Sequence, residues 1–352
     1  MAGGDEAAAW IALRAASGVG DVTGRKLVAE FGSPAAVPTL SRRAISAARR
    51  EADRIVAGGA RLIALDDAEY PELLRELHDA PLYLIAKGAR LADGPAVAIV
   101  GARRATPYGL EIARVLAEGL AHAGVAVVSG LARGIDGAAH EGALAARGAT
   151  AAVLGCGVDV VYPPEHRELA ARVAEQGTLL SERPMGTQPL PSHFPARNRI
   201  LAGMTQGTVV VEAAERSGSL ITARLANESG REVFAVPGRI DSPLSFGAHL
   251  LIRDGATLVR DVDDVLEQIA PALRARAAMR PGAKPTEAGD AEILDALNGG
   301  PASLDDLIRQ IGRPASEIIA MMLDLELRGL VRQLSGRQFQ LTGRFAGVGG
   351  FQ

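Results

Sequence analysis

The stretch 97–109 reads VAIVGARRATPYG, a short apolar run that passes at once into glycine and two arginines. Five similar runs follow, spaced by segments of helical pattern: VAVV (125–128), AAVL (151–154), TLL (178–180), TVVV (208–211) and VFAV (233–236). The runs are rich in β-branched residues and lack polar alternation, which is typical of parallel strands covered on both faces. Strands that alternate with helices in this way predict an α/β fold with a Rossmann-like, doubly wound, mostly parallel sheet.

The segments on either side of this core have other patterns. Before it, Gly18 and Gly20 form a predicted turn ahead of an apolar helix face, which belongs either to a phosphate-binding helix-hairpin-helix or to an ordinary helical bundle. After it come three amphipathic helical segments and a hairpin that turns at Ser335-Gly336. We therefore predict a helical domain of the SAM or helix-hairpin-helix type over residues 1–80, the Rossmann-like core over 81–270, a linker over 271–289 and a C-terminal winged helix-turn-helix domain over 290–344.

Composition restricts the class of function. Aromatic residues make up 3% of the 352 residues, which argues against a surface that binds nucleic acid mainly by stacking bases. The net charge is -3, so any nucleic-acid site must be a local basic patch. The only cysteine, Cys156, excludes an internal disulfide and a cysteine-rich metal site. With an acidic start and no long apolar stretch, we expect a cytoplasmic protein without metal or cofactor.

The candidate site lies in the loops that follow the predicted strands. In a doubly wound sheet, ligands bind beyond the carboxyl ends of the strands, where glycines permit close approach and helix N-termini favour anions. Tight turns between strand and helix need glycine in any case, but here several loops also carry arginine or serine. The predicted contacts from these loops are Gly101, Arg103, Arg104, Ser129, Gly130, Arg133, Gly134, Ser217, Gly218 and Ser219.

A second candidate cluster lies in the segment FPARNRIL, where proline suits the first turn of a helix. Arg197 shares a helical stripe with Leu201 and Met204, so we expect its side chain to point into the crevice. Asn198 lies next to it. Arg199 is rotated from Arg197 by about 200° on helical geometry, and either contacts DNA or forms a surface salt bridge.

Taken in order, these stretches resemble the DNA-processing protein A family, also called DprA or Smf. The resemblance covers residues 81 to 268 and rests on VAIVGARRATPYG, VVSGLARGIDGAAHEGAL, AVLGCGVDVVYPPEH, LLSERPMG, FPARNRILAGM, VVVEAAERSGSLITARLA and REVFAVPGRIDSPLSFGAHLLIRDGA. It implies a protein that binds and protects single-stranded DNA, loads the RecA recombinase during natural transformation and homologous recombination, and forms a homodimer through the core. Ala102 stands where the family commonly has serine, and Gly247-Ala248-His249 also departs from its pattern. Arg253 stands where lysine is common, keeps the charge, and completes the predicted DNA contacts.

The alternative is an enzyme. The core is similar in plan to lysine-decarboxylase-like phosphoribohydrolases, but the stretch 212–219, EAAERSGS, lacks their P-G-G-x-G-T-x-x-E signature. Asp136 and His140 lie four residues apart, and we interpret them as a capping carboxylate and a partly buried histidine. A transcription regulator is a third alternative, yet the predicted recognition helix 315–328 carries three acidic residues and one arginine. We therefore predict a DNA-binding protein without catalytic activity.

Overall fold

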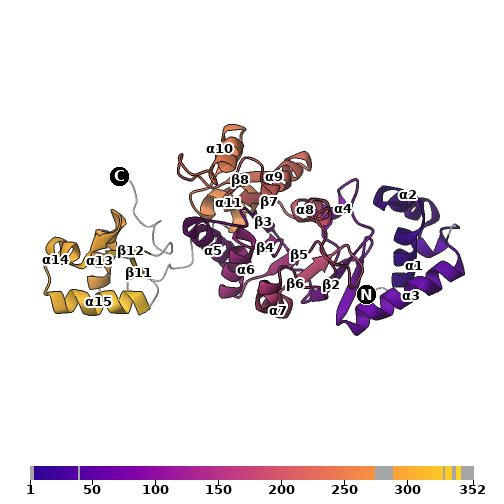
Figure 1. Ribbon diagram of the computed structural model, residues 1–352, viewed down its shortest axis with the longest axis horizontal. Coiled ribbons are helices and arrows are strands. Elements are labelled where there is room, and N and C mark those ends of the chain that lie inside the picture. The colour runs from indigo at the N-terminus through magenta and orange to yellow at the C-terminus, as the bar shows by residue number, and fades with distance from the viewer. Residues whose placement is uncertain (1–3, 39, 274–287, 328–329, 335–337, 342–352) are drawn as a thin grey trace. The chain divides into compact units, whose positions relative to one another are not determined.

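The computed structural model describes residues 4–38, 40–273, 288–327, 330–334 and 338–341. The chain divides into two compact units, residues 1–275 and 276–352, which are treated separately below (Figure 1). None of the helices in the described ranges has the length and apolar character that a membrane crossing needs.

The first unit is built on a nine-stranded sheet with the order β1-β2-β6-β5-β4-β3-β7-β8-β9. Strands β3 to β9 pair in parallel, while β1 and β2 form the antiparallel edge. The chain winds outward from β3 to β6 and then returns to β7 on the other side of β3, so the strand order reverses between β3 and β7. The strands are β1 (Ala60–Ala64), β2 (Tyr83–Gly88), β3 (Ala96–Val100), β4 (Ala126–Ser129), β5 (Thr150–Val153), β6 (Thr178–Ser181), β7 (Gly207–Val210), β8 (Glu232–Ala235) and β9 (Thr257–Leu258).

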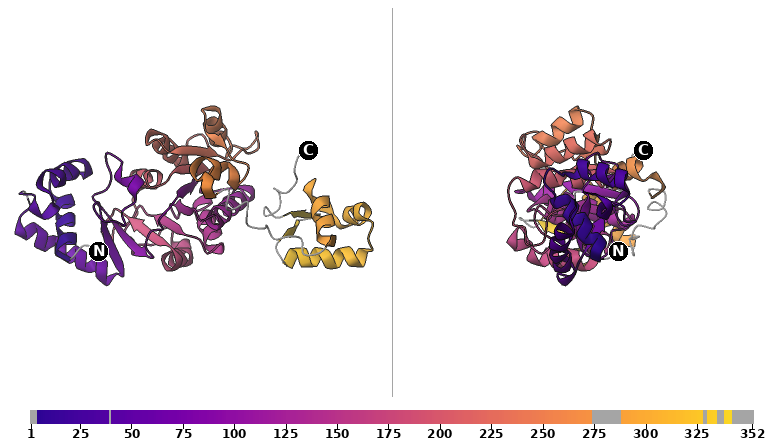
Figure 2. Two further views of the ribbon diagram at one scale, coloured as in Figure 1. Left: turned by 180° about the vertical axis from the view of Figure 1, so that it is seen from behind. Right: turned by 90° about the vertical axis from the view of Figure 1, so that its right-hand side faces the viewer.

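Helices cover both faces of this sheet (Figure 2). One face packs against α8 and α9, which supply Ile200, Leu201 and Ala223 to the core. The other face packs against α6, α7 and the N-terminal helices. The doubly wound fold predicted from the six apolar runs is thus confirmed, because each run forms one of the strands β3 to β8. The helices are α1 (Gly4–Ala15), α2 (Asp21–Phe31), α3 (Arg42–Ala57), α4 (Glu72–Arg75), α5 (Pro107–His122), α6 (Ile135–Ala145), α7 (Arg167–Gln176), α8 (His193–Gly203), α9 (Gly218–Glu228), α10 (Phe246–Arg253) and α11 (Val262–Ile269), with 3-10 turns at Pro34–Ala36 and Pro164–His166.

The N-terminal helices pack against the antiparallel edge of the sheet. Trp10 and Leu13 of α1 are fully buried and share a cluster with Ile55 of α3 and Ile85 of β2. Strand β1 also belongs to the sheet, so the sheet begins before the boundary that we placed between residues 80 and 81. The division into domains at that position and at residue 270 stays a prediction.

The second unit contains the three predicted helices and the hairpin. Ile293, Leu307, Ile318 and Leu325 are buried in its own apolar core. The predicted turn at Ser335-Gly336 and most of the predicted linker lie outside the described residues. The elements are α13 (Ala288–Asn298), β10 (Ala302–Ser303), α14 (Leu304–Ile311), α15 (Ala315–Leu327), β11 (Val331–Leu334) and β12 (Gln338–Leu341), with the strand order β10-β12-β11.

Candidate nucleic-acid interface

A pocket of about 610 Å³ lies at the carboxyl ends of β3 and β7, where the strand order reverses. Most of its lining comes from the loop after β3, the start of α6, the first turns of α8, and the loop that leads into α9, and Tyr162 adds to it from the loop after β5. This is the place where open α/β sheets bind their ligands. Of the predicted contacts, those that line the pocket are Gly101, Arg103, Arg104, Arg197, Asn198, Ser217, Gly218 and Ser219.

The loop after β3 presents two arginines to the pocket. Gly101 allows the loop to pass close to α6, because a Cβ there would lie 2.5 Å from Ile135 Cγ1. Arg103 and Arg104 are both exposed, and neither forms an ion pair with any residue in the described ranges. The Arg103 guanidinium lies 5.3 Å from the centre of the Phe194 ring, a cation–π contact that orients the side chain without neutralising its charge.

The N-terminus of α9 forms the opposite wall. Ser217 caps the helix: its Oγ accepts the backbone N–H of Ser219 at 3.3 Å, and the two hydroxyl oxygens are 2.7 Å apart. Gly218 is exposed, and a Cβ there would have no atom within 4 Å. Arg216, also exposed, forms no ion pair with a described residue. A helix N-terminus with an arginine and two hydroxyl groups favours an anion such as a phosphate.

Arg197 lies under the pocket rather than on its rim. Its side chain is buried, with 5% of the residue exposed, and Nη1 donates to the carbonyl oxygen of Val153 at the end of β5. The guanidinium fills the space beside Gly130, where a Cβ would collide with it. Nε has no hydrogen-bond partner among the described residues. Burial lowers the pKa of Arg197, and the nearby carboxylate of Asp136 opposes that change. The expected direction into the crevice is observed, but little of the side chain reaches the surface.

Asp136 organises the loop after β4. Its Oδ2 accepts the backbone N–H groups of Gly130 at 3.1 Å and of Ala132 at 3.4 Å. Burial raises the pKa of Asp136, while the Arg197 guanidinium and these backbone donors act in the opposite direction. The backbone N–H of Gly130 therefore already donates to Asp136 and is not available to donate to a phosphate.

Three further residues of the β4 loop have structural roles. Ser129 is fully buried and its hydroxyl donates to the carbonyl oxygen of Ile99 at 2.6 Å, so the prediction that it contacts DNA is wrong. Gly134 has φ 74°, and a Cβ there would collide with the Ala102 carbonyl oxygen, so its role is to let two loops meet. Arg133 is exposed and paired with Glu165 beside the pocket.

Arg199 lies outside the pocket lining because its guanidinium is engaged elsewhere. It bonds the Asp79 carbonyl oxygen at 2.8 Å, and its Nη2 lies 3.2 Å from Asp21 Oδ2 and 2.5 Å from Glu182 Oε2. Asp21 belongs to α2, so this network joins the N-terminal helices to α8 and to the end of β6. Arg199 is thus an ion-pair residue with a side chain that is 16% exposed, whereas the alternative expected a surface salt bridge. Its DNA contact stays a prediction that these ion pairs disfavour.

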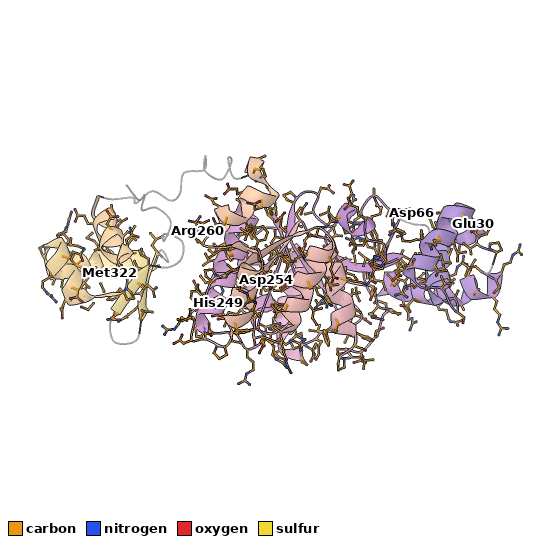
Figure 3. The ribbon with its side chains drawn as sticks, turned by 90° about the horizontal axis from the view of Figure 1, so that it is seen from above. Glu30, Asp66, His249, Asp254, Arg260 and Met322 are labelled. Carbon is orange, nitrogen blue, oxygen red and sulfur yellow. The ribbon has the colours of Figure 1, made fainter. Side chains whose placement is uncertain are left out.

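Arg253 is also removed from the pocket. It ends α10, which precedes the parallel strand β9, so it lies toward the amino edge of the sheet. Its neighbour Asp254, labelled in Figure 3, forms an ion pair with it, with 3.5 Å between Arg253 Nε and Asp254 Oδ1. The predicted DNA contact at Arg253 therefore does not share a surface with the pocket.

The carboxylate and imidazole groups that an enzyme would need have structural partners. Glu212 caps α5, since its carboxylate accepts the Thr106 backbone N–H at 2.9 Å and the Thr106 hydroxyl at 2.5 Å. His140 is fully buried, with Nδ1 2.8 Å from the Thr150 hydroxyl, and burial lowers its pKa to about 3. Within the described ranges, no group of three or more His, Cys, Asp or Glu side chains is arranged to hold a metal ion.

Comparison with known proteins agrees with this architecture. Residues 61–270 match the family model of DNA recombination-mediator protein A, and residues 277–337 match the DprA winged helix domain. The chain belongs to the DNA recombination-mediator protein A family. Protein Smf of Escherichia coli (strain K12) is a relative, 40% identical over 288 residues that cover 80% of this chain and 77% of that protein.

Two solved structures of the family are similar to this chain. DNA processing protein A from Streptococcus pneumoniae is 36% identical with a TM-score of 0.62, and the match covers 76% of this chain and 96% of that chain. DNA processing protein A from Helicobacter pylori, described for its unique single-stranded DNA binding mode, is 32% identical with a TM-score of 0.52, and the match covers 56% and 91%.

The lining residues that the sequence prediction omitted include one arginine, Arg216, and two aromatic residues, Phe194 and Tyr162. Arg216 belongs to a loop already singled out, and its place directly before two serines and a glycine was the available signal. Phe194 and Tyr162 form a tilted ring pair with centres 5.6 Å apart. No spacing connects these two rings in the sequence, because Tyr162 lies in the loop after β5 and Phe194 in the first turn of α8.

Proposed function

We propose that this member of the family binds single-stranded DNA in the pocket at the carboxyl edge of its sheet. The observation that carries the proposal is the convergence of three exposed arginines without ion-pair partners among the described residues, Arg103, Arg104 and Arg216, with the free N-terminus of α9. Arginine suits this task because its planar fork donates two parallel hydrogen bonds to a phosphate. The contacts are to the backbone, so binding is largely independent of base sequence.

Within this proposal two of the predicted contact residues, Arg103 and Arg197, have different roles. Arg103 is exposed on the rim and contacts a phosphate directly. Arg197 is nine-tenths buried and supports the pocket floor by holding Val153 and the Gly130 turn. Asn198 joins the two helices of the site, because its Nδ2 donates to the Gly218 carbonyl oxygen at 3.4 Å.

The wider biological role is proposed from the family resemblance. The Helicobacter pylori relative is described as binding single-stranded DNA. For this chain we propose the same ligand, protection of incoming DNA, loading of RecA during natural transformation and recombination, a homodimer formed through the core, and a cytoplasmic location. We also propose that it acts by binding alone, because Glu212 and His140 are already used by the fold.

The decisive experiment is a gel shift with single-stranded and duplex DNA over a series of salt concentrations. We expect preferential binding of the single strand, with a log–log salt slope that reports the number of phosphates contacted, about 0.7 for each. Equal affinity for both forms would contradict the proposal. In parallel, incubation with nucleoside monophosphates should release no base or phosphate above a boiled control, and robust turnover would favour the phosphoribohydrolase alternative.

A further inference from the structure

Helix α3 presents a row of arginines to solvent. Its buried side, which includes Ala48, Ala52 and Ile55, packs into the cluster that contains α1. Its five arginines against Glu51 and Asp53 leave this helix with a net charge of +3, whereas the whole chain carries -3. The exposed arginines of this helix are Arg42, Arg43, Arg49, Arg50 and Arg54.

The positions of Arg42 and Arg43 do not serve the stability of the helix. Arg42 and Arg43 are in the first turn, which holds no acidic residue, and a positive charge there opposes the helix dipole. Arg49 pairs with Asp5 and Arg54 with Glu51. Arg42, Arg43 and Arg50 form no ion pair with any residue that the structure describes. Three positive charges therefore remain available to a partner.

Helix α3 also contacts the loop that leads to the pocket. Oε1 of Glu51 accepts the backbone N–H of Met185 at 2.7 Å, and a Cβ on Gly58 would lie 2.6 Å from Met185 Cε. Met185 belongs to the loop between the carboxyl end of β6 and α8, and Pro191 of the same loop lines the pocket. Helix α3, through the buried Glu51 and through Gly58 at its end, and the pocket, through Pro191, thus contact one and the same loop.

We propose that Arg42, Arg43 and Arg50 form a second phosphate-binding surface, which holds the single strand after it leaves the pocket past the β6–α8 loop. The inference rests on the proposed function and extends the proposed binding surface from the pocket to helix α3. Residues 43 and 50 lie two helical turns apart, about 10 Å along the axis, a spacing that reaches separate phosphates of one extended strand. The recognised chemistry is the phosphodiester backbone, so binding here is independent of base sequence.

The test compares a short and a long oligonucleotide, of about 8 and about 60 nucleotides, since one single-strand site spans about 4–16 nucleotides. In the full chain, Arg42→Gln, Arg43→Gln and Arg50→Gln are combined. We expect unchanged affinity for the short oligonucleotide, about tenfold weaker binding of the long one, and a salt slope about 2 lower for the long one only. The melting temperature should stay the same or rise, because two charges that oppose the helix dipole are removed.

A matched control removes three exposed arginines elsewhere in the same unit, Arg147, Arg172 and Arg224, and should leave both oligonucleotides unaffected. A benzophenone on Ser46→Cys, on the exposed side of α3, should crosslink to the long oligonucleotide; Cys156 is buried and does not compete for the label. If the triple variant binds the long oligonucleotide like wild type, or weakens both equally, the inference is wrong while the pocket proposal stands.

Two other outcomes separate the remaining cases. A wild-type chain that binds neither oligonucleotide refutes the proposed function, and the inference with it. If the triple variant keeps its DNA affinity but loses binding of polyglutamate, α3 serves an acidic protein surface and the inference is overturned.

Discussion

The pocket and the winged-helix unit use arginine in opposite ways. In the pocket, Arg103 and Arg104 are exposed without a carboxylate partner among the described residues. In the winged-helix unit, Arg313 lies between two carboxylates, with 2.8 Å from Nε to Glu292 Oε2 and from Nη1 to Glu317 Oε1. These bonds raise the pKa of Arg313 and lower that of Glu292. The charge of Arg103 and Arg104 is available to a polyanion, and that of Arg313 is neutralised.

This difference shows that a fold known for binding DNA does not by itself make a DNA site. The second helix of a helix-turn-helix normally enters the major groove, yet α15 carries Glu317 and an exposed Ile319 and contains no basic residue. A nucleic-acid surface needs unpaired positive charge that can replace counterions at the phosphates. Among the described residues, the pocket meets that condition and α15 does not.

The largest expected effect comes from removing the free charge. Arg103→Ala combined with Arg104→Ala should weaken single-stranded DNA binding by about 4 kcal/mol, near a thousandfold, since each hydrogen bond to a charged group contributes about 2 kcal/mol. The salt slope should fall by about 1.4. The matched control is Arg309→Ala with Arg313→Ala in the winged-helix unit, which removes the same charge and should leave affinity unchanged. If both double variants weaken the binding of single-stranded DNA equally, the contrast between the pocket and the winged-helix unit is wrong.

The next prediction tests whether Arg199, which is ion-paired outside the pocket lining, stabilises the fold. Arg199→Ala leaves Glu182, whose side chain is 4% exposed, without its nearest partner. We expect the free energy of unfolding of the first unit to fall by about 3 kcal/mol in a denaturant titration. Because the Asp21 and Glu182 carboxylates hold the guanidinium, we expect Arg199 to contact no phosphate and the salt slope of the folded variant to match wild type. A flatter slope with unchanged stability would return Arg199 to the DNA-binding surface.

An effect that is smaller for each pH unit distinguishes the two units by the pH dependence of their stability. Burial lowers the pKa of His140 to about 3, whereas residues 276–352 contain no histidine. The unfolded chain takes up this proton near pH 6.5 and the folded unit does not, so the free energy of unfolding falls as the pH drops from 6.5 toward 3. The loss is at most about 1.4 kcal/mol per pH unit. His140→Gln should remove this component of acid sensitivity; identical pH profiles for variant and wild type would show that it is absent.

The smallest expected effect is that of deleting the winged-helix unit. A chain that ends at residue 273 should bind single-stranded DNA within about twofold of the full chain, because the unpaired arginines of the pocket remain and the removed helix α15 is acidic. Circular dichroism checks that the shortened chain is folded. Loss of binding in a folded chain would place the DNA site in the winged helix and reverse the comparison.

Most of the sheet was predictable because its central strands are short β-branched runs. Sequence reasoning missed β1 and β2 at one end of the sheet and β9 at the other. Strand β9 has only two residues, and β1, ARLIA, follows a long arginine-rich helix with no turn signal beyond two glycines. Strand β1 is buried on both faces through Leu62 and Ile63, which face different clusters. Its sequence alone does not reveal that burial, because the partner strand β2 lies about twenty residues later.

The candidate site was predictable in location and less so in its individual contacts. Arg103, Arg104 and Gly218 follow strands directly, and the carboxyl ends of parallel strands share one edge. Ser129 also follows a strand, but its hydroxyl is turned inward to Ile99. Arg253 resembles a family position, yet the direction of α10 carries it to the other edge. The position of a residue directly after a strand predicts the edge of the sheet at which it lies. The direction of its side chain depends on the residues that pack around it.

The sequence by itself determined the doubly wound sheet, the winged helix and the edge at which we propose that an anion binds, because these follow from local periodicity and from the order of strands and loops. Only the tertiary structure decided which arginines are free. Arg103 and Arg199 are alike as residues, but Asp21 and Glu182 meet Arg199 from distant parts of the chain and none of the described carboxylates pairs with Arg103. An ion pair depends on distance in space, and the spacing of residues along the chain does not give that distance.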